Sequence, residues 1–240
     1  MLNEVLGFIL LIVCFSGITL AFRFFGKAGL YAWTAMAIII ANIQVTKIIQ
    51  VFGLITAMGN VIYGSTFLVT DILTERYGVK CAKKAVLIGF FAMVFATLIM
   101  QLTILFEPHE SDVISPAMAQ VFHFMPSAMV ASLAAYLLSQ FHDVWAFEMW
   151  KKRTNGRFLW LRNNASTMVS QFIDNVTFTL LFFVIFNPDF FATLGFQGIF
   201  EIFITSYAMK FIVAILDTPF IYLNTSFKVP DEDQRDLKIF

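Results

Sequence analysis

Five charged residues of this chain lie inside long apolar runs, where a charge is costly. They are Lys47, Asp71, Asp174, Lys210 and Asp217, whereas all other Lys and Arg residues fall in polar gaps between the runs or in the tail. A charged side chain at bilayer depth costs at least about 2.5 kcal/mol, so such residues usually face a cavity or a charged partner. Their presence predicts a polar site within a membrane, which is typical of a transporter.

Polar side chains recur at the spacing that gathers them on one face of a helix. Asp174 and Lys210 lie near the middle of two consecutive runs, so they could pair across neighbouring helices. We predict that the polar faces line one compartment, since hydrogen bonds between membrane helices average under about 1 kcal/mol and hardly offset five buried charges. The alternative is a set of structural ion pairs. The faces comprise Thr167, Ser170, Gln171, Asp174 and Asn175; Ser206, Lys210 and Asp217; and Gln44 with Lys47.

The five charged residues in the apolar runs are two cations and three carboxylates, so one carboxylate has no counter-charge. The surplus group could bind a cationic or amidine-like edge of a substrate, or carry a proton. In the alternative interpretation, Asp71 and Asp217 reach the cytoplasmic interface and are hydrated there.

The composition excludes several classes of protein. The chain has 240 residues, of which 59% are hydrophobic and 13% charged; about a quarter is charged in ordinary soluble domains. Its net charge is zero, so no nucleic-acid partner is expected. The two cysteines, Cys14 and Cys81, form no metal-binding or disulfide pattern. Neither a phosphate-binding GxxxxGK[ST] loop nor an HExxH motif is present, so we expect neither an enzyme nor a bound cofactor.

The apolar runs predict an all-α, multi-pass bundle, since a span needs roughly 20 apolar residues. One transmembrane domain over residues 1–226 and a cytoplasmic tail over 227–240 are expected. Gly53, Gly59 and Gly64 interrupt the second and third runs, so one span there could be broken or re-entrant. The seven predicted spans are 5–22, 30–50, 58–76, 84–106, 117–140, 165–186 and 199–223.

The gaps between these spans alternate completely in charge. Segments 51–57, 107–116 and 187–198 contain no Lys or Arg, whereas each of the other gaps contains several. By the positive-inside rule, the N-terminus is then outside the cell and the C-terminus in the cytoplasm. The 142–164 segment is predicted to be the largest cytoplasmic loop. Small membrane proteins often pair, so a homodimer is possible.

Four short blocks carry a resemblance to a known family. Residues 67–78, FLVTDILTERYG, match the signature F-L-x-T-D-x-x-x-E-x-Y-G of the queuosine precursor transporters, also called the vitamin uptake transporter family. Residues 165–174, ASTMVSQFID, match its second signature, A-S-x-x-x-S-Q-x-x-D. Asn42 with Lys47 resembles its N-x-x-x-x-K pattern, and Tyr207 through Lys210 resembles its last helix. Where the family often has Phe-Pro, this chain has Tyr63-Gly64, and we expect Gly64 to preserve the local kink.

The resemblance implies a bacterial cytoplasmic-membrane importer of 7-deazaguanines, the bases from which queuosine in tRNA is made. It also implies a fold similar to the substrate-binding subunits of energy-coupling-factor transporters, working without their ATPase module. Asp174 or Asp71 would accept the two donors of the base, and Gln171, Asn42 or Lys47 would donate to its oxygen. The predicted substrate-binding residues are Asn42, Gln44, Lys47, Asp71, Gln171, Asp174 and Lys210; the predicted gate or structural residues are Tyr63, Gly64, Glu75, Ser170 and Asp217.

A second hypothesis is a binding subunit that works only within an ATP-driven vitamin uptake complex. Such a subunit needs a docking surface of small residues. The helix face formed by Ala82, Ala85 and Gly89 offers one.

Overall fold

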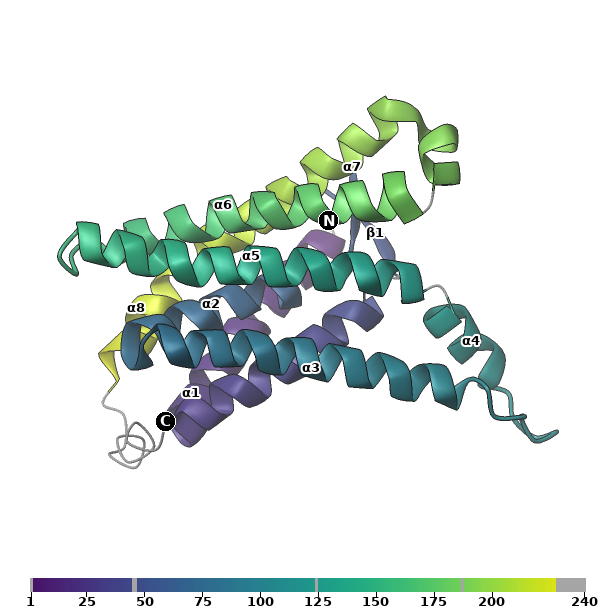
Figure 1. Ribbon diagram of the computed structural model, residues 1–240, viewed down its shortest axis with the longest axis horizontal. Helices are drawn as coiled ribbons and strands as arrows, with labels where there is room; N and C mark the ends of the chain where they lie inside the picture. Colours follow the sequence, from purple (N-terminus) through teal and green to yellow (C-terminus); the bar gives the residue numbers. More distant parts are fainter. Residues whose placement is uncertain (1, 45–46, 124, 187, 228–240) are drawn as a thin grey trace.

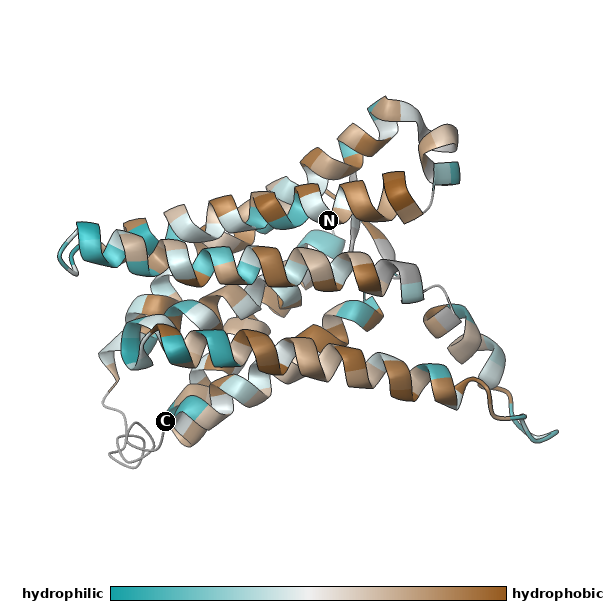
Figure 2. Cartoon of the chain, in the orientation of Figure 1, coloured by the Kyte–Doolittle hydropathy of each residue, from teal (hydrophilic) through white to brown (hydrophobic). Residues whose placement is uncertain are grey.

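Long apolar helices build the molecule, as a computed structural model shows (Figure 1). The structure describes residues 2–44, 47–123, 125–186 and 188–227. Within these residues, four helices are long and apolar enough to cross a membrane: α1 (Leu2–Gln44), α3 (Val79–Thr103), the run 159–186 and the run 195–226. Hydrophobic residues cover their middles (Figure 2), and many large ones are exposed, as expected where lipid is the solvent. The predicted all-α class is confirmed.

Helix α1 is a hairpin of two antiparallel halves that meet at Gly26. The backbone of Gly26 has a φ of 55°, which reverses the chain. The Trp33 ring lies directly against Gly17, although sixteen residues of straight helix would separate them by about 24 Å. The two halves correspond to the predicted spans 5–22 and 30–50, except that the second half ends at Gln44.

A β-hairpin replaces the expected end of the second span. Strand β1 (Ile48–Val51) pairs antiparallel with β2 (Leu54–Ala57), and Val51 lies opposite Leu54. Phe52 and Gly53 both have positive φ, the conformation of a tight two-residue hairpin turn. The β-branched run favours strands here. Lys47 is therefore exposed and lies outside the helix, so its predicted placement on a helix over 30–50 is wrong.

Helix α2 (Asn60–Tyr77) occupies the centre of the bundle. Nearly every residue from Val61 to Thr74 is buried. Its neighbours are α1, α3, α5, α6, α7 and α8. The expected kink at Gly64 is absent, because α2 is helical throughout. A side chain at Gly64 would instead collide with Val213, so this glycine permits close approach of α2 and α7.

Helix α5 (Met125–Arg153) continues far beyond its predicted end at residue 140, and α6 (Leu159–Thr179) begins earlier than predicted. A five-residue turn joins them, with positive φ at Asn155, Gly156 and Phe158. The predicted cytoplasmic loop over 142–164 is therefore wrong. Apolar runs stop at charged residues, but helices need not; Glu148 and Lys152 pair one turn apart on the extended helix.

The remaining elements complete the two ends of the bundle. Helix α4 (Ser115–His123) follows α3, and a π-helical segment, η1 (Leu180–Phe186), extends α6. Helix α7 (Pro188–Leu216) turns at Gly195, where φ is 65°. Asp217 separates α7 from α8 (Thr218–Ser226), and Pro219 lies in the first turn of α8.

Successive helices of the described residues run back and forth between two ends of the bundle that differ in their residues. The basic end gathers the Gly26 turn, the α2–α3 junction, the α5–α6 turn and α8 (left in Figure 1). Lys151 pairs there with Glu75 at 3.3 Å, and the Trp160 amide donates to the Tyr222 hydroxyl. The opposite, hairpin end holds the β-hairpin, the end of α3, α4 and η1. Counting both halves of α1, seven segments of the described chain run between these ends.

Replacing Gly89 by Ala should destabilise the bundle by about 1–3 kcal/mol, the usual cost of overpacking. An added methyl group would collide with the Tyr136 hydroxyl and crowd Thr34. The measurement is the thermal unfolding midpoint in detergent. Gly7→Ala is the matched control, since nothing lies near Gly7 and Ala favours helix. Equal midpoints for the two variants would contradict this packing.

Candidate functional site

A buried ion pair joins α6 and α7 at the centre of the site. The Lys210 ammonium lies 2.5 Å from Asp174 Oδ2, and both side chains are less than a tenth exposed. The Tyr63 hydroxyl, from α2, donates to Asp174 Oδ1, and Ser139, from α5, lies 3.3 Å from the same oxygen. The Lys210 ammonium also lies 5.4 Å from the centre of the Tyr63 ring. The predicted proximity of Asp174 and Lys210 is therefore observed.

Helical spacing on α6 explains why these groups face inward. Thr167, Ser170, Gln171 and Asp174 repeat every three or four residues, and all four side chains are buried. Helix α6 packs against α5 on one side and α7 on the other. The polar stripe consequently points into the bundle rather than toward lipid.

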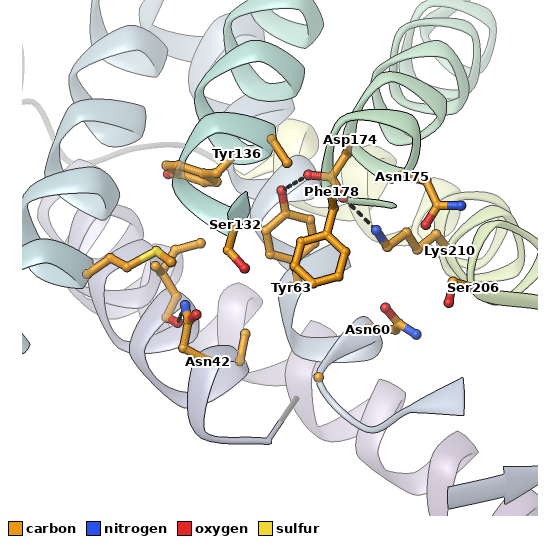
Figure 3. A pocket seen from close by; sticks show the side chains of 15 residues that line it. Asn42, Asn60, Tyr63, Ser132, Tyr136, Asp174, Asn175, Phe178, Ser206 and Lys210 are labelled. Carbon is orange, nitrogen blue, oxygen red and sulfur yellow. Dashed lines mark hydrogen bonds and ion pairs between the residues drawn. The ribbon is translucent and has the colours of Figure 1, made fainter. Parts of the chain in front are cut away.

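A cavity of about 100 Å³ adjoins the ion pair, toward the hairpin end. Figure 3 shows the rings of Tyr63 and Phe178 beside Asp174 and Lys210. Amide and hydroxyl groups supply further donors and acceptors around the cavity. Such a lining suits a flat, heteroaromatic ligand with several polar edges. The polar residues that complete the lining are Asn42, Asn60, Ser132, Tyr136, Asn175 and Ser206.

Sequence reasoning found part of this lining. Asn42, Tyr63, Asp174 and Lys210 were predicted site residues, and they line the cavity. Asn175 and Ser206 appeared in the polar stripes, although not among the predicted site residues. Four residues had no distinguishing signal in the sequence. These are Asn60, Ser132, Tyr136 and Phe178.

Four predicted binding residues, Gln44, Lys47, Asp71 and Gln171, lie outside the cavity lining. Gln44 ends the second half of α1. Lys47 is exposed beyond it. Gln171 is buried one turn from Asp174 towards the basic end, where both of its amide atoms lack a partner among the described residues. Gln171 faces α2 near Gly64, with its amide nitrogen close to that glycine.

A second group of charges lies deeper in the bundle. Asp71 of α2, Asp143 of α5 and Asp217 at the α7–α8 junction are all fully buried. We call them the three-aspartate cluster. Thr167 lies 3.4 Å from a carboxyl oxygen of Asp71 and of Asp143, so one hydroxyl adjoins both. Asp71 does not line the cavity. Because Asp71 and Asp217 are both fully buried, the interpretation of these two residues as hydrated interfacial groups is wrong.

An ionic network closes the basic end beyond this cluster. The Arg162 guanidinium is almost fully buried, lies 2.8 Å from Glu75 and donates to the carbonyls of Gly156 and Arg157. Lys151 contacts the other Glu75 oxygen. Ser170, predicted as a gate or structural residue, bonds the Ser166 carbonyl. Among the described residues, the interior is therefore polar along α6, from the cavity to this network.

A bundle of membrane-length helices around a charged, aromatic-lined cavity is the architecture of a membrane transport protein. The chain belongs to the vitamin uptake transporter family: residues 57–224 match the family described as "Putative vitamin uptake transporter". It is also 38% identical over 224 residues to the "Probable queuosine precursor transporter" of Bacillus subtilis, covering 92% of this chain and 94% of that protein.

No solved structure matches the chain. The expected likeness to substrate-binding subunits of energy-coupling-factor transporters therefore stays a prediction.

Proposed function

We propose that this protein imports 7-deazaguanine precursors of queuosine across a bacterial cytoplasmic membrane. The Bacillus relative carries a matching name over nearly its whole length. The observation that supports the proposal most is the buried Asp174 beside an aromatic-lined cavity. A transporter of this size that holds one small, flat molecule needs such a site and no reaction centre.

The chemistry of the base fits the cavity. A deazaguanine presents a ring N–H and an exocyclic amine on one edge, and a carboxylate accepts such a pair with its two oxygens. Asp174 supplies the carboxylate, while Lys210 or Asn60 donates to the carbonyl oxygen of the base. The rings of Tyr63 and Phe178 offer faces for stacking. On binding, the base would compete with Tyr63 and Lys210 for the oxygens of Asp174.

The charge distribution supports an orientation. Apart from Lys47 and Lys210, the Lys and Arg side chains of the described residues belong to the basic end, so this end would face the cytoplasm. The cavity then lies nearer the outside, and Glu75 with Arg162 closes the path below it. The N-terminus would be external and the C-terminus cytoplasmic. A homodimer stays a prediction.

The docking argument for an ATP-driven complex is weakened. Ala82 and Ala85 are fully buried, and Gly89 packs against Tyr136 and Thr34. This face therefore serves the inside of the bundle and offers no surface to another subunit. The structure gives that alternative no specific support.

Cells that lack their own importer should accumulate labelled 7-deazaguanine when they express this protein. Purified protein in liposomes should also take up the base without ATP or another subunit. Cells carrying the empty vector provide the control. Uptake equal to that control would refute the proposed function, and uptake in cells but never in liposomes would favour the ATP-driven complex.

A further inference from the structure

We propose that the three-aspartate cluster binds a proton that is transported together with the substrate. The inference rests on the proposed transport function and adds its source of energy. Asp71, Asp143 and Asp217 come from three different parts of the bundle and meet in its interior. None of them lines the substrate cavity.

Two of these carboxyl groups share one hydrogen-bond donor. The Thr167 hydroxyl lies 3.4 Å from Asp71 Oδ2 and 3.4 Å from Asp143 Oδ1, but it has one hydrogen and can donate to only one of them. Asp71 Oδ1 is buried and has no hydrogen-bond partner among the described residues, so a proton bound to the pair would supply the missing donor. Two hydroxyl groups adjoin Asp143: the Thr70 hydroxyl lies 3.5 Å from Oδ2 and the Thr167 hydroxyl 3.4 Å from Oδ1. A proton bound here would be surrounded by several acceptor oxygens from the carboxyl and hydroxyl groups.

The third carboxyl group, Asp217, has one oxygen that lacks a hydrogen-bond donor in the described part of the chain. The Asn163 amide nitrogen donates to Asp217 Oδ1 at 2.7 Å, and Asn163 is fully buried. The amide oxygen of Asn163 and Oδ2 of Asp217 have no hydrogen-bond partner among the described residues. Two buried oxygen acceptors cannot satisfy each other unless one carries a hydrogen. An O–H on Asp217 would supply it.

The charged neighbours do not neutralise the cluster. On α2, Glu75 lies one turn from Asp71 but pairs with Arg162 of α6 and Lys151 of α5. The His142 ring on α5 contacts Ser170 at 2.9 Å. Lys210 on α7 is held by Asp174. Within the residues that the structure describes, no ion pair joins a cation to Asp71, Asp143 or Asp217. Three ionised carboxylates buried in this way would be very costly, so protons must compensate them.

A polar route links the cluster to the substrate cavity. Thr167 and Asp174 are seven residues apart on α6, which corresponds to about 10 Å along the helix. Gln171 lies between them, buried, with both amide atoms unpartnered among described residues. Its amide can accept and donate at once. Substrate binding at Asp174 can therefore alter the hydrogen bonding that reaches Thr167.

The coupling step involves only proton transfer. A proton from outside forms an O–H bond on a carboxylate of the cluster while the base occupies the cavity. When the site opens toward the cytoplasm, that O–H bond breaks and the proton leaves with the base. No electrons are exchanged and no covalent bond to the substrate is made.

Proteoliposomes with an interior one pH unit more alkaline than the medium test this proposal. Since one pH unit is a tenfold ratio of proton concentration, one proton per neutral base allows up to tenfold accumulation of labelled 7-deazaguanine. A protonophore should abolish that accumulation. Asp143→Asn should lower it to about onefold while exchange of internal for external base continues at a measurable rate. The control is Asp112→Asn, in the exposed segment between α3 and α4, and this variant should still accumulate the base tenfold.

Each outcome separates the two proposals. If the wild-type protein exchanges the base but accumulates it equally with and without the pH gradient, the proton site is refuted and the transport function stands. Accumulation driven by a sodium gradient alone, or tenfold accumulation by Asp143→Asn, refutes the site as well. A wild-type protein that neither exchanges nor accumulates the base refutes the proposed function. If Asp143→Asn does not fold, alkalinisation of the medium on base addition to wild-type vesicles decides the question.

Discussion

Single replacement of Asp174 by Asn, or of Lys210 by Met, is expected to reduce 7-deazaguanine binding at least 100-fold. Each variant leaves the other member of the pair buried without its counter-charge. Breaking a buried pair in this way typically costs about 3–5 kcal/mol. The measurements are binding of the labelled base to the purified protein and the unfolding midpoint in detergent.

The double variant distinguishes a binding site from a structural pair. Removing both charges leaves no uncompensated ion, so the double variant should regain most of the lost stability. Binding should remain at least 100-fold weaker, because the carboxylate that receives the base is missing. Asp112→Asn should match the wild-type protein in both measurements, since Asp112 lies on the exposed loop. A stable double variant with normal binding would show that the pair is only structural.

Arg162→Met is expected to have the second largest effect, a loss of about 3–5 kcal/mol of folding free energy. It removes a nearly fully buried cation from Glu75 and one hydrogen-bond donor from each of two carbonyl oxygens of the α5–α6 turn, those of Gly156 and Arg157. The measurement is chemical or thermal unfolding in detergent.

Arg157→Met is the matched control, since Arg157 is an exposed arginine of the same turn. It should change the unfolding free energy by less than about 0.5 kcal/mol. If Arg162→Met has no larger effect than Arg157→Met, the Glu75–Arg162 network does not hold the basic end together.

The polar stripe of α6 could be predicted because two independent signals coincide there. Helical spacing places Thr167, Gln171 and Asp174 on one face of a helix. Because exposing polar or charged side chains to lipid is costly, this face is expected to pack against protein. Lys47 carried the same two signals, because it lies in an apolar run and three residues after Gln44. Its neighbours Ile48, Ile49 and Val51 fit a strand as well as a helix, and only the structure shows that they form a strand.

Asp143 was missed for the opposite reason. It lies beyond the apolar run that ended the predicted span at residue 140, so it was assigned to a loop. In the structure the bundle itself surrounds α5 there, and polar neighbours such as Thr167 compensate the carboxyl group. Hydropathy measures preference for lipid, so it cannot recognise a helix segment that is buried in protein.

The aromatic residues of the cavity lining could not all be predicted from the sequence. The chain has thirty Phe residues, and nothing in the sequence distinguishes Phe178 from the others. Tyr136 becomes identifiable only because α3 approaches α5 at Gly89.

A structure of the protein with bound 7-deazaguanine tests the central claim most directly. The account predicts the base in the cavity beside Tyr63, with its N–H and amine edge on the Asp174 carboxylate and Lys210 or Asn60 near its carbonyl oxygen. A base bound elsewhere, with the Asp174–Lys210 pair closed and the cavity unchanged, would contradict it.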